Sequence, residues 1–128
     1  MSRTDERRAA TFTSYQRDVT GQAKPEEELT PFARELVGGV EEHREELDRL
    51  ISDNAVGWSI DRIAPLERAI LRIALLEMLY RPDIPDEVAI DEAVETAKMY
   101  CGADAPTFVN GILGGVMKRL SGGDRRPA

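Results

Sequence analysis

The side chains able to form covalent bonds or to bind a metal ion are few in this sequence and lie far apart. His43 is the only histidine, and it stands in the acidic run EEHREE, where a solvated helix face explains it. Cys101 is the only cysteine, so it forms no disulfide within the chain and fits a reducing compartment. A metal site built on these two residues would need two more ligands at suitable spacing, and the sequence offers none. We therefore predict that the protein is not an enzyme and needs no cofactor.

A second set of residues is suited to non-covalent binding of RNA. Arg7 and Arg8 are adjacent near the start of the chain, and Tyr15 follows about two helical turns later. Phe108 falls in the first turn after an expected helix cap, where a bulky ring is often only half covered. Bases of single-stranded RNA stack on such rings, while guanidinium groups bind phosphates. Arginines in such positions more often belong to a solvated helix start than to an RNA contact, so the residues alone do not assign Arg7 and Arg8 to RNA.

The net charge of −7 argues against a protein that contacts a phosphate backbone, but the charge is unevenly distributed. Acidic residues are concentrated between residues 24 and 53, whereas both ends of the chain carry an excess of basic residues. A basic site built from the ends could therefore coexist with an acidic body. No segment approaches the roughly 20 apolar residues of a membrane span, and the start, MSRTDERRAATF, has arginines without the apolar run of a secretory segment. We expect a cytoplasmic protein without membrane contact.

Capping residues and hydrophobic periodicity predict an all-α protein. The first helix is expected from about residue 4 to 19, with Ser2 as its cap and a buried stripe of Ala9, Phe12, Gln16 and Val19. The second helix begins at Thr30-Pro31, after a short acidic loop over residues 24–29. Glycines at 38 and 39 and the histidine at 43 lie near its middle, so one long helix and two shorter ones both fit.

The second half of the chain has clearer helix signals. Pro65 opens the most apolar helix, whose stripe is too wide for a surface helix, so we expect it at the centre. Asp91 is expected to cap the next helix, and Asp104 with Pro106 to start the last one. Trp58 is expected to pack between two lobes, and Met78, Met99 and Met117 to lie in the core. The tally is six or seven helices in one domain of residues 1–120, with lobes of about 1–57 and 58–120 and a disordered polar tail at 121–128.

Three consecutive segments resemble the C-terminal half of the NusB family: DRIAPLERAILRIALLEMLY, RPDIPDEVAIDEAVETAKMYCG and FVNGILG. The segment RRAATFTSYQRDVTG resembles the family's first helix more faintly. The resemblance implies an all-helical bundle of two packed three-helix lobes that acts by binding. NusB-like proteins pair with NusE, a small-subunit ribosomal protein, and hold the boxA element of nascent RNA. RNA polymerase in the antitermination complex then reads through terminators, notably in ribosomal RNA operons.

The resemblance also assigns roles to particular residues of this chain. The residues expected at the RNA are Arg3, Arg7, Arg8, Tyr15, Asp104 and Phe108. The residues expected to meet NusE are Asp61, Glu67 and Arg72. Thr4, Asp5 and Glu6 interrupt what is usually a denser basic run, which implies fewer phosphate contacts and a larger contribution from the partner.

Two other interpretations remain open from the sequence. The acidic total and the sparse basic start are compatible with a self-associating interaction module, a homodimer in which the RNA surface is weak or masked. NusB-like domains also precede some RNA methyltransferase domains. The chain reaches Ala128 without a cofactor-binding unit, so we do not expect a methyltransferase.

Overall fold

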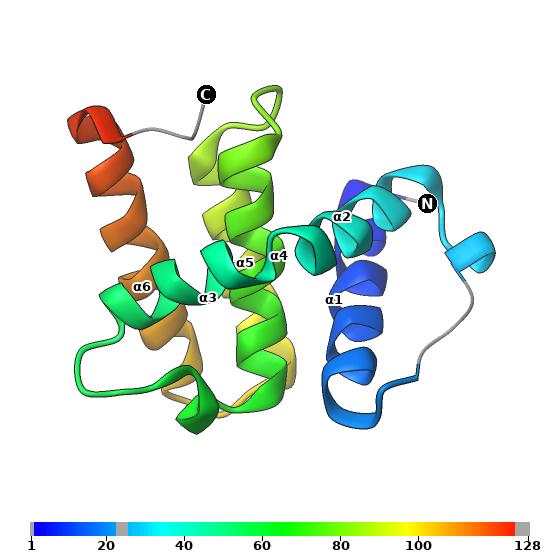
Figure 1. Ribbon diagram of the computed structural model, residues 1–128, viewed down its shortest axis with the longest axis horizontal. Coiled ribbons are helices and arrows are strands. Elements are labelled where there is room, and N and C mark those ends of the chain that lie inside the picture. Colours follow the sequence, from blue (N-terminus) through cyan, green and yellow to red (C-terminus); the bar gives the residue numbers. More distant parts are fainter. Residues whose placement is uncertain (1, 23–25, 125–128) are drawn as a thin grey trace.

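The structure, a computed structural model, describes residues 2–22 and 26–124, and over these residues it is all-helical, as predicted. The described part contains six α-helices and no strand (Figure 1). Their bounds are α1 (Arg3–Thr20), α2 (Pro31–Glu42), α3 (Arg44–Asn54), α4 (Pro65–Tyr80), α5 (Asp86–Tyr100) and α6 (Ala105–Arg119). Three short turns are η1 (Glu26–Glu28), η2 (Ile60–Arg62) and η3 (Leu120–Asp124). None of the helices in the described ranges combines the length and apolar character of a membrane span.

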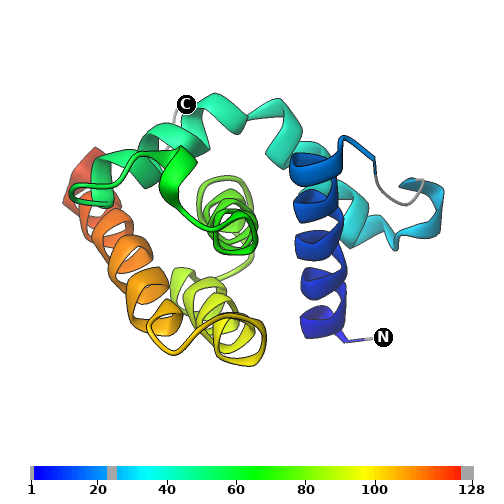
Figure 2. The same ribbon diagram turned by 90° about the horizontal axis from the view of Figure 1, so that it is seen from below.

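Helix α4 is the centre of the molecule. Figure 2 views it nearly end-on, with the other five helices arranged around it, and each of them packs against it. Every residue from Ala69 to Leu79 is buried, because the helix has neighbours on all sides; most of these residues are apolar, and the charged Arg72 and Glu77 are paired. The prediction of a central helix opened by Pro65 is therefore confirmed.

The predicted start signals hold for the first two helices. Ser2 and Asp5 form a reciprocal capping box at the start of α1, and Gly21 ends that helix with a left-handed φ of 76°. The Thr30 hydroxyl accepts a hydrogen bond from the Ala33 amide ahead of Pro31. The acidic loop expected at 24–29 falls partly outside the described residues, and its second half forms η1.

The start of α5 was predicted wrongly. The helix begins at Asp86, directly after Pro85, and Asp91 is an exposed residue inside it. Pro85 ends the extended joint after α4, and the acids Asp86 and Glu87 then occupy the first helical turn, where the helix dipole favours negative charge. Asp91 therefore resembles a capping residue in the sequence, but in the structure it is a surface residue more than one turn after the start of the helix.

The break within the second predicted helix occurs at His43. This residue separates α2 from α3 with φ −109° and ψ 19°, while Gly38 and Gly39 remain helical. Its ring stacks on Tyr80 of α4 at 4.0 Å between centroids and 14° between planes. The interpretation of His43 as a residue of a solvated face was wrong, because the corner between the two helices turns it toward α4.

The predicted stripe of α1 was displaced by about one residue. Gln16 and Val19 are exposed, whereas the residues buried along this helix are Arg7, Ala10, Thr11, Thr13 and Ser14. Small side chains allow α1 to approach α4, and ion pairs hold its two ends. Near the N-terminus Arg7 pairs with Glu77, and near the C-terminus Asp18 pairs with Arg68 and Arg72. Because this face of α1 is buried largely through small and polar side chains, it has no regular spacing of apolar residues by which the sequence could identify it.

Two further expectations differ from the structure. Met99 is 56% exposed, so its assignment to the core was wrong, while Met78 is buried. The chain continues past Leu120 as the π-helical turn η3 up to Asp124, where a disordered tail had been expected from Ser121. The remaining tail, 125–128, lies outside the described residues. The division into lobes of about 1–57 and 58–120 stays a prediction.

Candidate nucleic-acid interface

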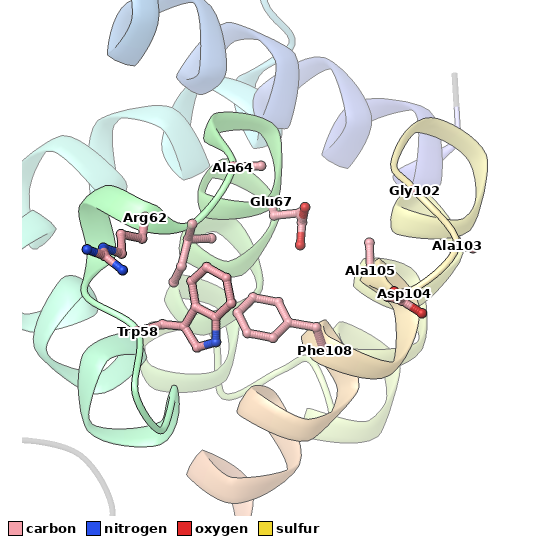
Figure 3. Close-up of a pocket in the computed structure, with 10 residues that line it drawn as sticks. Trp58, Arg62, Ala64, Glu67, Gly102, Ala103, Asp104, Ala105 and Phe108 are labelled. Carbon is pink, nitrogen blue, oxygen red and sulfur yellow. The ribbon is translucent and has the colours of Figure 1, made fainter.

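A pocket of about 470 Å³ opens between the connector that precedes α4 and the turn between α5 and α6. Figure 3 shows the rings of Trp58 and Phe108 side by side at one end of it, with the Glu67 carboxylate directed into the space beside them. The other residues that line it are Arg62, Ile63, Ala64, Gly102, Ala103, Asp104 and Ala105. Two stretches far apart in sequence, residues 58–67 and 102–108, therefore supply two aromatic rings and one inward-facing carboxylate.

The two rings meet edge to face, with 6.4 Å between centroids and 64° between planes. Trp58 remains 51% exposed, and Phe108 is half-buried against the core. The expectation that Trp58 packs between lobes was therefore wrong, whereas Phe108 has the half-covered ring that its place in the first turn of α6 predicted. Each ring offers apolar surface on which a flat ligand can stack.

Glu67 is half-buried at this pocket and forms no hydrogen bond or ion pair with any residue that the structure describes. Burial raises the pKa of its carboxyl group above the ordinary value. Burial and the neighbouring charge of Glu67 likewise raise the pKa of Cys101, which is half-buried at the end of α5. The carboxylate is thus partly desolvated without compensation from the protein.

Helices α1 and α5 run in the same direction along this side of the molecule. The Thr4 hydroxyl donates to Glu92 at 2.9 Å, and eight residues later on each helix Phe12 meets Tyr100 at 5.0 Å between ring centroids. Continuing this register carries Tyr15 to the level of the turn between α5 and α6 that borders the pocket. Tyr15 is half-buried, so its ring is not sealed in the core.

Arg8 shares one face of α1 with Phe12 and Tyr15, because these residues are spaced at four and three positions. It forms no hydrogen bond or ion pair within the described part of the chain, and its Nε atom is buried without an acceptor. We call the set Arg8, Phe12, Tyr15 and Tyr100 the aromatic strip. It leads from the start of α1 toward the pocket.

Two of the other expected RNA contacts are placed differently. Arg7 is 8% exposed, and its Nε donates to both oxygens of Glu77, so its guanidinium is engaged inside the protein. The expectation that Arg7 takes an RNA phosphate therefore has no support in this geometry. Arg3 is exposed, pairs with Glu6 at 3.3 Å and lies 3.9 Å over the ring of Phe32, on the side of α1 that faces α2.

Asp104 occupies the N-cap position of α6, but its carboxylate makes no capping hydrogen bond. It is exposed and lines the pocket on the side of the α5–α6 turn. The sequence therefore located the start of this helix correctly, and the structure leaves the Asp104 side chain available at the rim.

The three residues expected to meet NusE do not form one surface. Arg72 is 3% exposed, and its guanidinium pairs with Asp48 at 2.7 Å and Asp18 at 3.2 Å. Burial alone would lower its pKa, but the bonds to Asp48 and Asp18 raise it above the ordinary value. Asp61 is exposed on η2, and Glu67 faces the pocket. Of the three, only Asp61 is on an open surface, and the expectation for Arg72 is contradicted by its burial.

Sequence reasoning missed Phe12, Tyr100 and the role of Trp58. Phe12 had been taken as part of a buried stripe, and Tyr100 follows the last buried residue of α5 without any local signal. The spacing of Arg8, Phe12 and Tyr15 on one helix face was visible in the sequence and could have identified the strip. Within residues 2–22 and 26–124, no three His, Cys, Asp or Glu side chains gather as a metal site would require.

Comparisons with known proteins bear on the family and the fold of this chain. Residues 2–118 match the sequence profile of the NusB family. The chain is 53% identical over 97 residues to the transcription antitermination protein NusB of Symbiobacterium thermophilum, an alignment that covers 76% of this chain and 63% of that protein. It is 44% identical to the NusB of Rubrobacter xylanophilus over 99% of both chains. A solved structure of NusB and NusE in complex with dsRNA superposes with a TM-score of 0.76 at 26% identity, covering 93% of this chain and 99% of that one. This chain therefore belongs to the NusB family.

Proposed function

We propose that this chain is a transcription antitermination protein that binds boxA-type single-stranded RNA together with NusE and promotes read-through by RNA polymerase. The observation that carries the proposal is the aromatic strip, which leads toward the pocket of Trp58 and Phe108 on a chain of the NusB family. Related proteins are named transcription antitermination protein NusB, and one solved relative is a complex of NusB and NusE with RNA. The proposed activity is binding without a chemical step, and it would be exercised in the cytoplasm.

Each residue of the proposed interface has a distinct task. Arg8 would bind a phosphate, because its guanidinium forms no hydrogen bond or ion pair with a described residue and its Nε atom has no acceptor. Arg3 would bind a second phosphate near the start of α1, where it is exposed. Tyr15 and Phe108 would stack on bases, and Asp104 would lie beside the RNA at the rim of the pocket. Arg7 acts indirectly in this proposal, since its pair with Glu77 fixes α1 on α4.

Few cations face the proposed RNA surface, so the partner is expected to contribute substantially. The chain has a net charge of −7, and two unpaired carboxylates, Glu67 and Asp104, line the pocket itself. Phosphate contacts dominate the affinity of most RNA-binding proteins, and few contacts mean weak binding and a shallow salt dependence. The exposed turn η2 with Asp61 is the surface that we propose for NusE.

A titration of a fluorescent boxA RNA with this protein, with and without NusE, tests the proposal at two salt concentrations. We expect weak binding alone and much tighter binding when NusE is present. Arg8→Ala and Tyr15→Ala should each weaken RNA binding, both without NusE and with it. Retention of RNA that is the same with and without NusE and is indifferent to both substitutions would refute the proposal.

Self-association is a second candidate function, favoured by one specific observation. The exposed apolar side chains include Val56, Trp58, Met99 and Tyr100, of which Trp58 lines the pocket and Tyr100 belongs to the aromatic strip. A second copy that covered them would mask the RNA surface. Light scattering over a concentration series distinguishes the two functions, because a masking dimer dissociates when RNA is added, whereas a dimer formed elsewhere persists.

A further inference from the structure

The pocket beside Phe108 contains a carboxylate that the protein leaves without a partner. Glu67 faces a space of about 470 Å³ and is half-buried beside two aromatic rings. A partly desolvated carboxylate is unfavourable unless donors reach it, and no described residue supplies one. Water reaches the carboxylate in the open pocket of the free protein, so a ligand that displaces this water must bring donors of its own.

We propose, on the basis of the function proposed above, that this pocket takes one guanine base of the bound RNA and that Glu67 reads its Watson–Crick edge. The base would stack on the ring of Phe108 or Trp58 and abut the other ring. Its N1–H and exocyclic N2–H groups would both donate to the Glu67 carboxylate. This proposal assigns Glu67 to base recognition, whereas the resemblance of the chain to the NusB family had assigned it to contact with NusE.

The chemistry of the lining favours a base over a phosphate. Glu67 and Asp104 carry negative charge. Among the described lining residues the only guanidinium belongs to Arg62, and Figure 3 shows it directed away from the space between Glu67 and the rings. A phosphate would meet two carboxylates without a cation facing it. A planar base instead meets two ring surfaces and one acceptor, which is the usual combination at sites that recognise unstacked bases. The volume also lies within the range of sites that enclose small ligands.

Guanine is the base whose hydrogen-bonding edge matches a carboxylate. A carboxylate offers only acceptors, so the matching edge must present two adjacent donors. Guanine does so through N1 and N2. Adenine and cytosine each place a ring-nitrogen acceptor beside their amino group, and uracil flanks its single N–H with two carbonyl oxygens. Each of these three would direct an acceptor at Glu67.

The test uses the full chain and fluorescence anisotropy with 12-nucleotide RNAs of uridine that carry one central variable base. The variable base is guanine, inosine, adenine or uracil, and each titration is run with and without NusE. Inosine keeps N1–H and lacks the N2 amino group, so it removes one of the two donors. Glu67→Gln is compared with Glu87→Gln as a control. Glu87→Gln also removes one negative charge, but from an exposed position in the first turn of α5, at the end of that helix far from the pocket. Thermal unfolding verifies that both variants are folded.

For the unsubstituted protein we expect guanine to bind about tenfold more tightly than adenine or uracil, with inosine intermediate. Glu67→Gln should reduce the preference for guanine to about twofold or less, whereas Glu87→Gln should keep it. If the unsubstituted protein binds all four RNAs equally well, the inference about Glu67 is overturned while the proposed function stands. This comparison needs no variant protein. A preference that survives in Glu67→Gln also overturns it. The absence of binding to every RNA, including boxA with NusE, would overturn the proposed function and the inference together.

Discussion

The Nε atom of Arg7 donates hydrogen bonds to both carboxylate oxygens of Glu77, at 2.8 and 2.9 Å, inside the contact between α1 and α4. Both side chains are almost fully buried, and Glu92 lies 3.9 Å from the same guanidinium. Burial raises the pKa of Glu77, although the hydrogen bond and charge of Arg7 act in the opposite direction. Desolvation of the carboxylate thus outweighs the attraction of its partner. The pair positions α1, and we expect it to contribute little net stability of its own, as is common for buried ion pairs.

Removing one member of this pair should destabilise the protein much more than removing both. Arg7→Ala or Glu77→Gln leaves a buried polar or charged group without its partner, and we expect a loss of about 3–5 kcal/mol in the free energy of unfolding. The double variant Arg7→Met with Glu77→Leu replaces both groups by apolar ones and should lie within about 1–2 kcal/mol of the unsubstituted protein. Urea unfolding of the four proteins measures this. If the double variant loses as much stability as the two single variants together, the conclusion that the pair mainly positions α1 is wrong.

Arg7 and Arg8 are adjacent, yet their substitutions should have opposite signatures. Arg8→Ala should change the free energy of unfolding by no more than about 0.5 kcal/mol, because this side chain has no partner among the described residues. It should weaken RNA binding and reduce the slope of log affinity against log salt by about 1. Arg7→Ala should lower stability while leaving that slope unchanged in protein that is still folded. Titrations at several salt concentrations, paired with thermal unfolding, separate the two effects.

The two glycines inside α2 provide a matched pair for testing the packing of α2 on α4. A Cβ atom at Gly39 would come within 2.5 Å of a Leu76 side-chain carbon, whereas one at Gly38 would meet nothing within 4 Å. Gly38→Ala should therefore stabilise the protein by about 0.5–1 kcal/mol through helix propensity. Gly39→Ala should destabilise it by about 1–3 kcal/mol, because Leu76 is buried and its neighbours must shift. Equal effects in chemical denaturation would show that α2 and α4 are not this close.

Tyr80 should make stability depend on pH in the alkaline range. Burial, together with the hydrogen bond that its hydroxyl donates to Glu46, raises its pKa to about 12 from an ordinary value of about 10. A pKa raised in the folded state means a stabilisation that is complete below pH 10 and is lost as the pH rises toward 12. The difference in unfolding free energy between the unsubstituted protein and Tyr80→Phe should therefore shrink between these values. A difference that stays constant would show that the tyrosine is not perturbed.

Local signals in the sequence were sufficient to predict the helices and much of the core. Prolines, capping hydroxyls and glycines act on their own neighbours, so the starts of α1, α2, α4 and α6 could be read directly. The wide apolar stripe of α4 could only be satisfied at the centre of a bundle. The NusB-like segments identified the family for the same reason, because they are contiguous in the chain.

The sequence could not determine the orientation of single residues where polar contacts between helices decide that orientation. Successive helical residues point about 100° apart, so a displacement of one residue turns Arg7 inward and Arg8 outward. The choice depends on Glu77, a partner 70 positions away that no local pattern reveals. The pocket also depends on packing, since the stretch that carries Trp58 and Glu67 meets the stretch that carries Phe108 only after α4, α5 and α6 have packed. Tertiary packing therefore decided the geometry of the binding surface, while the chain alone determined the helices that carry it.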